Sequence, residues 1–124
     1  MIAPARWWSS AHSWSGSGAN MTLDPRPGGC FRERLPGGGG VEHLRVVSAA
    51  PGTSLRTTGA LGPLQGEALT GVMTLTLKAG GAGTSVTLRY AVAARRTGGT
   101  ALAPAVDAAL AEQVARLKTA AGHR

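Results

Sequence analysis

Cysteine is almost absent from this chain of 124 residues, because Cys30 is the only one. A single cysteine cannot form an intrachain disulfide, which excludes the disulfide framework of small secreted domains and favours the reducing cytoplasm. Long hydrophobic runs are also missing, since glycine, threonine or a charge interrupts every apolar stretch within a few residues. The sequence therefore predicts neither a signal peptide nor membrane insertion.

Acidic residues are few: 6 Asp and Glu stand against 13 Lys and Arg, for a formal net charge of +7. Such an excess raises the question of a nucleic-acid partner. Most arginines, however, fall singly along the chain, and no basic helix or interleaving of basic and aromatic residues is present. Because a nucleic-acid footprint needs clustered charge, we expect an ordinary solvated surface and no nucleic-acid partner.

Aromatic side chains are scarce as well, being limited to Phe31, Tyr90 and three tryptophans. All three tryptophans lie in the stretch "ARWWSSAHSWSG", residues 5–16. With so few large side chains, the composition suits a thin or hollow core in which each aromatic residue matters by its position.

Ligands for metals and phosphates are poorly represented. The candidate metal ligands are not paired at ligand spacing, so we predict no metal site and no cofactor; they are Cys30, His12, His43 and His123. Alternation along its strand places His43 on the outer face of the sheet. The glycine-rich runs lie between strands and lack the lysine of a phosphate-binding loop, which excludes a nucleotide cradle.

Glycine and proline divide the rest of the chain into short segments with a period of two, which predicts six strands joined by tight turns. The segments are 21–24, 30–35, 41–48, 55–61, 72–78 and 84–94. After residue 99 the spacing of Val106, Leu110, Val114 and Leu117 predicts a helix over about 103–121. We expect an α+β fold in which residues 1–20 precede one domain over 21–124, with its strands within 21–95.

Two carboxylates fall among the inward-facing residues. Alternation places Glu33 beside Phe31, and Glu42 beside Leu44, on either side of the turn "PGGGG". Facing each other on an apolar surface, the two carboxylates would raise the pKa of at least one. The alternative is that both lie at the rim of the sheet and reach water.

Five segments of the sequence occur in an order that can be compared with known folds: "WWSSAHSWSG", "LDPRPGGCFRERL", "GGVEHLRVVSAAPGTSLRTTGALGPLQG", "VMTLTLKAGGAGTSVTLRYAVA" and "LAPAVDAALAEQVARLK". Together they resemble the helix-grip fold of the START and pollen-allergen-like superfamily, SRPBCC. Within it they are most similar to the branch related to chaperone-ATPase activators and polyketide cyclase-like proteins. The resemblance covers nearly the whole chain from Arg6 onward.

The resemblance also implies a shortened N-terminus. Members of that branch begin with an edge strand and a helix, which have no counterpart before the tryptophan segment here, so either the chain is a short form or its start has been assigned too late. The strand over 84–94 would then be an open edge. We expect the chain to be poorly stable alone or to form a homodimer through that edge.

A cavity between the sheet and the helix is the site that the resemblance implies, with a hydrophobic, lipid-like or polyketide-like small molecule as its ligand. Trp8 and Trp14 either line this cavity or plug its mouth as core. The candidate ligand-binding residues are Trp8, Trp14, Phe31, Glu33, Leu44, Thr57, Met73, Leu75, Tyr90, Leu110 and Val114.

Two other functions remain open beside simple binding. One is an enzyme of the cyclase, aromatase or hydrolase type, in which Glu33 would be the general acid or base and Tyr90 a proton donor or oxyanion partner. The other is a protein-interaction module like the chaperone-ATPase activators, acting through outer-face residues such as Arg32. The fold hosts all three functions, so the sequence leaves open whether the chain is an enzyme.

Overall fold

A computed structural model describes residues 3–66, 69–94 and 103–122 of the chain. Arg95, at the predicted end of the last strand, and His123, among the candidate metal ligands, lie outside these residues.

Six strands form a single sheet in the order of the sequence, from β1 to β6. All neighbouring strands pair antiparallel, since every connection is a short turn or loop. The predicted meander is confirmed. The strands are β1 (Met21–Leu23), β2 (Cys30–Arg34), β3 (Gly40–Ala50), β4 (Ser54–Thr58), β5 (Leu69–Gly80) and β6 (Gly83–Ala94).

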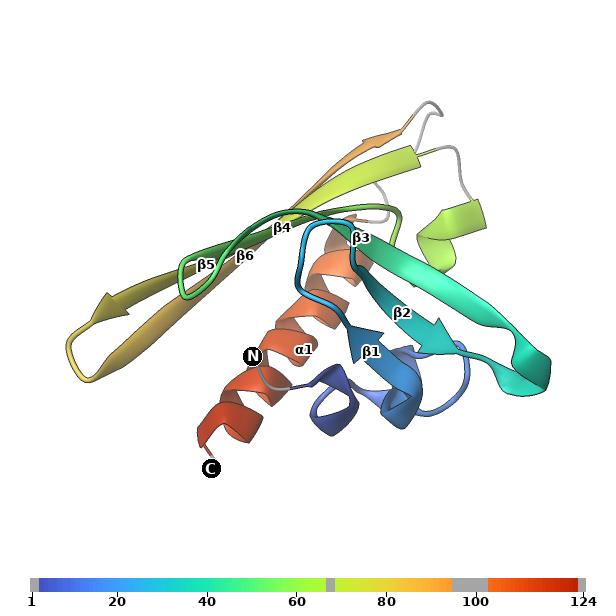
Figure 1. Cartoon of the computed structure of the whole chain (residues 1–124), viewed down its shortest axis with the longest axis horizontal. Coiled ribbons are helices and arrows are strands. Elements are labelled where there is room, and N and C mark those ends of the chain that lie inside the picture. Colours follow the sequence, from blue (N-terminus) through green and yellow to red (C-terminus); the bar gives the residue numbers. More distant parts are fainter. Residues whose placement is uncertain (1–2, 67–68, 95–102, 123–124) are drawn as a thin grey trace.

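One long helix, α1 (Ala103–Gly122), lies against the inner face of this sheet. Figure 1 shows the strands arching over α1, with the β5–β6 hairpin reaching beyond it. The apolar stripe of α1 places Leu110, Val114 and Leu117 toward the strands, as its spacing predicted. The α+β helix-grip architecture is therefore confirmed.

Short 3-10 turns make up the chain before β1. They are η1 (Pro4–Arg6), η2 (Ser10–His12) and η3 (Gly18–Asn20), and two more, η4 (Pro36–Gly38) and η5 (Gly62–Gly66), occur in the loops of the sheet. Residues 4–20, here called the N-terminal segment, approach the core at Trp8, whose ring meets that of Phe31 edge-on with centroids 5.0 Å apart. Met21, Phe31 and Leu44 are buried together at this junction.

A bulge in β3 changes which side chains face inward. Phe31 pairs with Leu44, whereas Arg32 pairs with Glu42, so the ladder leaves His43 as an extra residue. His43 and Leu44 are both buried, while Glu42 is exposed. The predictions that Glu42 faces inward and His43 outward are both wrong, because strict alternation does not survive the extra residue.

Glu42 instead makes contacts on the outer face of the sheet. Its carboxylate accepts a hydrogen bond from Arg45 at 2.6 Å and lies 3.1 Å from the Cys30 sulfur. Across the strands, Glu33 pairs with Val41, so the two carboxylates do not face each other.

Candidate functional site

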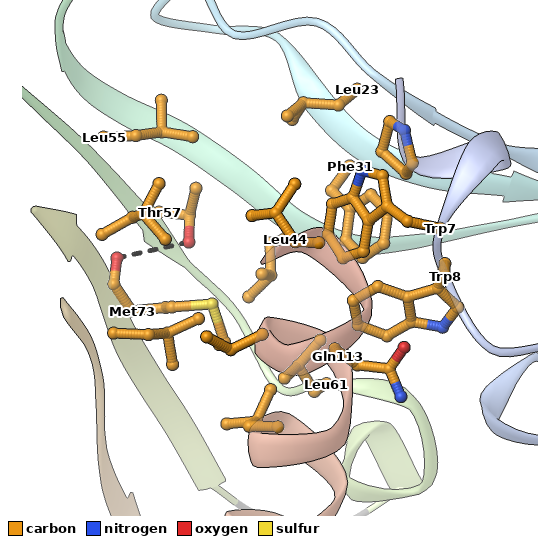
Figure 2. A pocket seen from close by; sticks show the side chains of 16 residues that line it. Trp7, Trp8, Leu23, Phe31, Leu44, Leu55, Thr57, Leu61, Met73 and Gln113 are labelled. Carbon is orange, nitrogen blue, oxygen red and sulfur yellow. Dashed lines mark hydrogen bonds between the residues drawn. The ribbon is translucent and has the colours of Figure 1, made fainter. Parts of the chain in front are cut away.

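The space between the sheet and α1 contains a cavity of about 90 Å³. Strands β1 to β6 form its roof, α1 forms its floor and the N-terminal segment closes one side (Figure 2). Its wall is dominated by aliphatic and aromatic side chains: Pro4, Trp7, Trp8, Leu23, Phe31, Leu44, Leu55, Thr57, Leu61, Met73, Leu75, Leu88, Leu110, Gln113, Val114 and Leu117.

Two polar side chains in the wall are already hydrogen bonded to the protein. The Thr57 hydroxyl donates to the Met73 carbonyl at 3.4 Å (Figure 2). The Gln113 amide accepts from the Ser9 backbone N–H at 2.9 Å and donates to the Ala109 carbonyl at 3.3 Å. The wall therefore presents an apolar surface in which the polar groups have partners within the protein.

The N-terminal segment supplies Pro4, Trp7 and Trp8 to this wall. Trp8 donates its indole N–H to the His12 carbonyl at 3.1 Å, which fixes the ring over Phe31. Arg116 of α1 donates to the Trp7 carbonyl at 2.6 Å. The segment thus bridges the sheet and the helix at the side of the cavity.

Eight of the eleven residues predicted for the ligand site line this cavity. They are Trp8, Phe31, Leu44, Thr57, Met73, Leu75, Leu110 and Val114. Of the other wall residues, Leu117 belongs to the predicted apolar stripe of the helix, and Leu55 and Leu88 lie in predicted strands. Sequence reasoning gave no cavity role to Pro4, Trp7, Leu23, Leu61 or Gln113. Leu61 is the last residue of a predicted strand, and Gln113 lies beside the apolar stripe of the predicted helix. No other feature of the sequence pointed to these two residues.

Trp14 and Tyr90 lie outside the cavity wall. Trp14 is 49% exposed, and its ring meets His43 edge-on with centroids 6.3 Å apart. The Tyr90 hydroxyl donates to the Gly59 carbonyl at 2.7 Å and accepts from the Leu61 N–H at 3.1 Å. Burial raises the pKa of Tyr90, and these bonds give its hydroxyl the task of holding the 59–61 loop.

Glu33 also lies outside the wall, in a buried pair with His43. Its side chain is fully buried, and that of His43 is 4% exposed. One carboxylate oxygen of Glu33 accepts from His43 Nε2 at 2.9 Å and from the Trp14 N–H at 3.1 Å. The other accepts from the Ser15 N–H at 2.5 Å. The carboxylate therefore fastens the N-terminal segment to the sheet.

The pKa of Glu33 reflects these donors. Burial by itself would raise this pKa, but the hydrogen bonds from Ser15, His43 and Trp14 outweigh burial and hold the pKa below its ordinary value. The expected rise is wrong for Glu33, because the carboxylate meets three donors in place of a second carboxylate.

Neither a metal-binding cluster of side chains nor a membrane-spanning helix is present among the residues that the structure describes. Over residues 3–66, 69–94 and 103–122, no three His, Cys, Asp or Glu side chains gather into a metal-binding group. No helix within those ranges is long and apolar enough to cross a membrane.

Comparison with known proteins agrees with this architecture. A family model described as "Polyketide cyclase / dehydrase and lipid transport" matches residues 5–122. Searches of curated proteins and of solved structures found no match. Because the family model covers the N-terminal segment, all six strands and α1, the chain belongs to the polyketide cyclase/dehydrase and lipid transport family.

Proposed function

We propose that this protein binds a small apolar molecule in the cavity between its sheet and α1. The observation that carries the proposal is the character of the wall: its aliphatic and aromatic side chains surround two polar ones, Thr57 and Gln113, whose groups already have partners. A ligand that offers apolar surface gains from leaving water for such a wall. Membership of a family with lipid transport in its description supports the same class of ligand.

The size of the cavity restricts the ligand further. Its 90 Å³ is below the roughly 150 Å³ of an engineered apolar cavity that takes benzene, and far below the roughly 300–1,000 Å³ of drug-sized sites. A short acyl segment or a single small ring is therefore the upper limit for this space, and a ring such as that of p-xylene enters only if the wall widens. A lipid-like or polyketide-like ligand would require the N-terminal segment or α1 to move outward.

Binding can be tested by titrating the ¹⁵N-labelled protein with p-xylene and recording backbone amide shifts. We expect saturable shifts that cluster at the wall, including those of Leu44, Met73 and Leu110. Shifts that scatter over the surface or rise linearly with concentration would contradict the proposal.

A pair of variants in one turn of α1 sharpens this test. Val114→Phe adds a ring inside the cavity and should weaken p-xylene binding about tenfold or more, because it fills the space that the ligand needs. Ala115→Phe adds the same ring on the exposed side of the helix and should leave the dissociation constant unchanged. Equal effects of the two variants would contradict binding in the cavity.

An acid–base enzyme is the second candidate, and the buried Glu33–His43 pair is the observation that favours it. In that case a bound ligand is converted to product, and Glu33→Gln abolishes conversion while binding survives. Mass spectrometry of ligands after prolonged incubation with the protein tests this directly. Unchanged ligands across aromatic and acyl compounds would leave simple binding as the function.

A further inference from the structure

His43 is placed inside the fold by an irregularity of the sheet. The bulge opposite Phe31 and Arg32 makes His43 the extra residue of β3 and turns its ring inward. The pairing changes phase at this residue, so His43 and Leu44 are both buried although they are neighbours in the sequence. A bulge that redirects a polar ring into the interior is a common feature beside functional sites.

Glu33 fixes the orientation and the proton of this ring. The carboxylate accepts hydrogen bonds only, so His43 Nε2, 2.9 Å away, is the nitrogen that donates. In the neutral ring, His43 Nδ1 is then left with a free lone pair as an acceptor. The side chains of both residues are at least nine-tenths buried, so the pair is held in one geometry.

Within the described part of the chain, His43 Nδ1 has no hydrogen-bond partner. Among the described residues, it is the one buried side-chain nitrogen or oxygen atom in this condition. A buried acceptor without a donor is destabilising, and such an atom is an unused point of recognition. It also differs from the polar groups of the cavity wall, which already bond to the protein.

Phe31 connects this atom to the cavity. Its ring packs against His43 with centroids 5.5 Å apart, and the same ring lines the cavity beside Trp8. Leu44, the residue after His43, lines the cavity too. The Phe31 ring therefore contacts both His43 and the apolar space, and a shift of this ring would bring the His43 ring to the edge of that space.

We propose that His43 Nδ1 accepts a hydrogen bond from a hydroxyl group of the bound ligand. The ligand class is then an apolar ring or chain that carries one hydroxyl, with the apolar part in the cavity and the hydroxyl beside Phe31. This inference rests on the proposed function. His43 accepts the hydrogen bond from the hydroxyl, and Glu33 acts as the positioning residue that, in the neutral ring, holds the proton on Nε2.

The test compares two ligands of nearly equal shape, p-cresol and p-xylene, in which a hydroxyl replaces a methyl. The measured quantity is the ratio of their dissociation constants in amide-shift titrations at neutral pH. Relative to wild type, His43→Phe should shift this ratio about tenfold against p-cresol, which is the size of one neutral hydrogen bond. His12→Phe, a change at an exposed histidine, should leave the ratio as in wild type.

A second measurement needs no variant and so does not depend on whether His43→Phe folds. The ¹⁵N resonance of His43 Nδ1 in the wild-type protein should move upfield on saturation with p-cresol and stay in place with p-xylene. This measurement reports on the acceptor atom itself. If His43 had only a structural role, p-cresol would not move its Nδ1 resonance.

Each outcome separates the two proposals. If p-xylene binds in the cavity but p-cresol does not move the Nδ1 resonance, the role of His43 is overturned and apolar binding stands. If the ratio is the same in wild type and a folded His43→Phe, the role of His43 is overturned likewise. If neither compound binds, both proposals fail.

Discussion

Glu33 is a carboxylate in an apolar setting that is tolerated because three donors surround it, two of them backbone amides of the N-terminal segment. Glu33→Gln replaces one accepting oxygen by an NH₂ group, which must then face a donor. We expect the free energy of unfolding at neutral pH to fall by about 3 kcal/mol. Urea unfolding followed by tryptophan fluorescence measures this, and Glu42→Gln, at an exposed carboxylate, should cost less than about 1 kcal/mol.

The same carboxylate predicts how stability depends on pH. Its pKa in the folded chain lies below the ordinary value of 4.5, so the unfolded chain binds the proton more readily. The stabilisation is complete above the unfolded pKa and is lost as the pH falls through the folded pKa. The difference in unfolding free energy between wild type and Glu33→Gln should therefore shrink as the pH is lowered from 6 to 3. A constant difference over that range would contradict the role given to Glu33.

At the scale of elements, the contacts that attach the N-terminal segment to α1 contribute unequally to the free energy of unfolding. The buried Gln113 side chain satisfies the buried Ser9 N–H, whereas the His12–Glu112 pair one residue away is substantially exposed. Gln113→Leu leaves the Ser9 N–H without a partner and should lower the free energy of unfolding by about 1–3 kcal/mol. Glu112→Ala should change it by less than about 1 kcal/mol.

Thermal unfolding of both variants, followed by circular dichroism, checks this order. Gln113→Leu makes the wall of the cavity more apolar, so a ranking by hydrophobicity alone would predict that it stabilises the protein. A melting temperature at or above that of wild type would show that the Ser9 N–H finds another partner.

For the whole molecule, the open edge of β6 is the feature that bears on assembly. β6 is the last strand of the sheet, and Val86 and Val92 on it are exposed. Within the described residues, no strand lies beside the outer edge of these 12 residues, and such an edge is a template for a second chain. We expect homodimers in size-exclusion chromatography with light scattering, and Val86→Lys should shift them toward monomer. A stable, well-folded monomer of the wild-type chain would contradict this prediction.

The sequence predicts the order and pairing of the strands, and it predicts inward-facing residues best where the pairing has no bulge. Between β4, β5 and β6 the pairing runs without interruption, and the predicted site residues Thr57, Met73 and Leu75 do line the cavity, whereas Val86 and Val92 on β6 are exposed. In β3 the same rule exchanged Glu42 and His43, because a bulge depends on the neighbouring strand and leaves no periodic signal in its own.

Long-range partners were equally hidden from the sequence. Gln113 bonds to Ser9, 104 positions away, and the Trp14 N–H reaches Glu33 from a segment without periodicity. Such contacts depend on how the N-terminal segment lies between the sheet and the helix. The resemblance to the SRPBCC superfamily implied that Trp8 and Trp14 meet the cavity, but it could not separate Trp8 from the exposed Trp14.

The extra residue in β3 has a consequence for comparing this chain with its relatives. Any relative whose strand alternates without interruption has one position fewer between Val41 and Val46, so a correct alignment needs a gap of one at His43 or Leu44. An alignment without that gap would assign the residues on one side of the bulge to the wrong face of the strand. Relatives that share the insertion would form a subgroup, recognisable by a histidine in this place and a glutamate ten positions earlier.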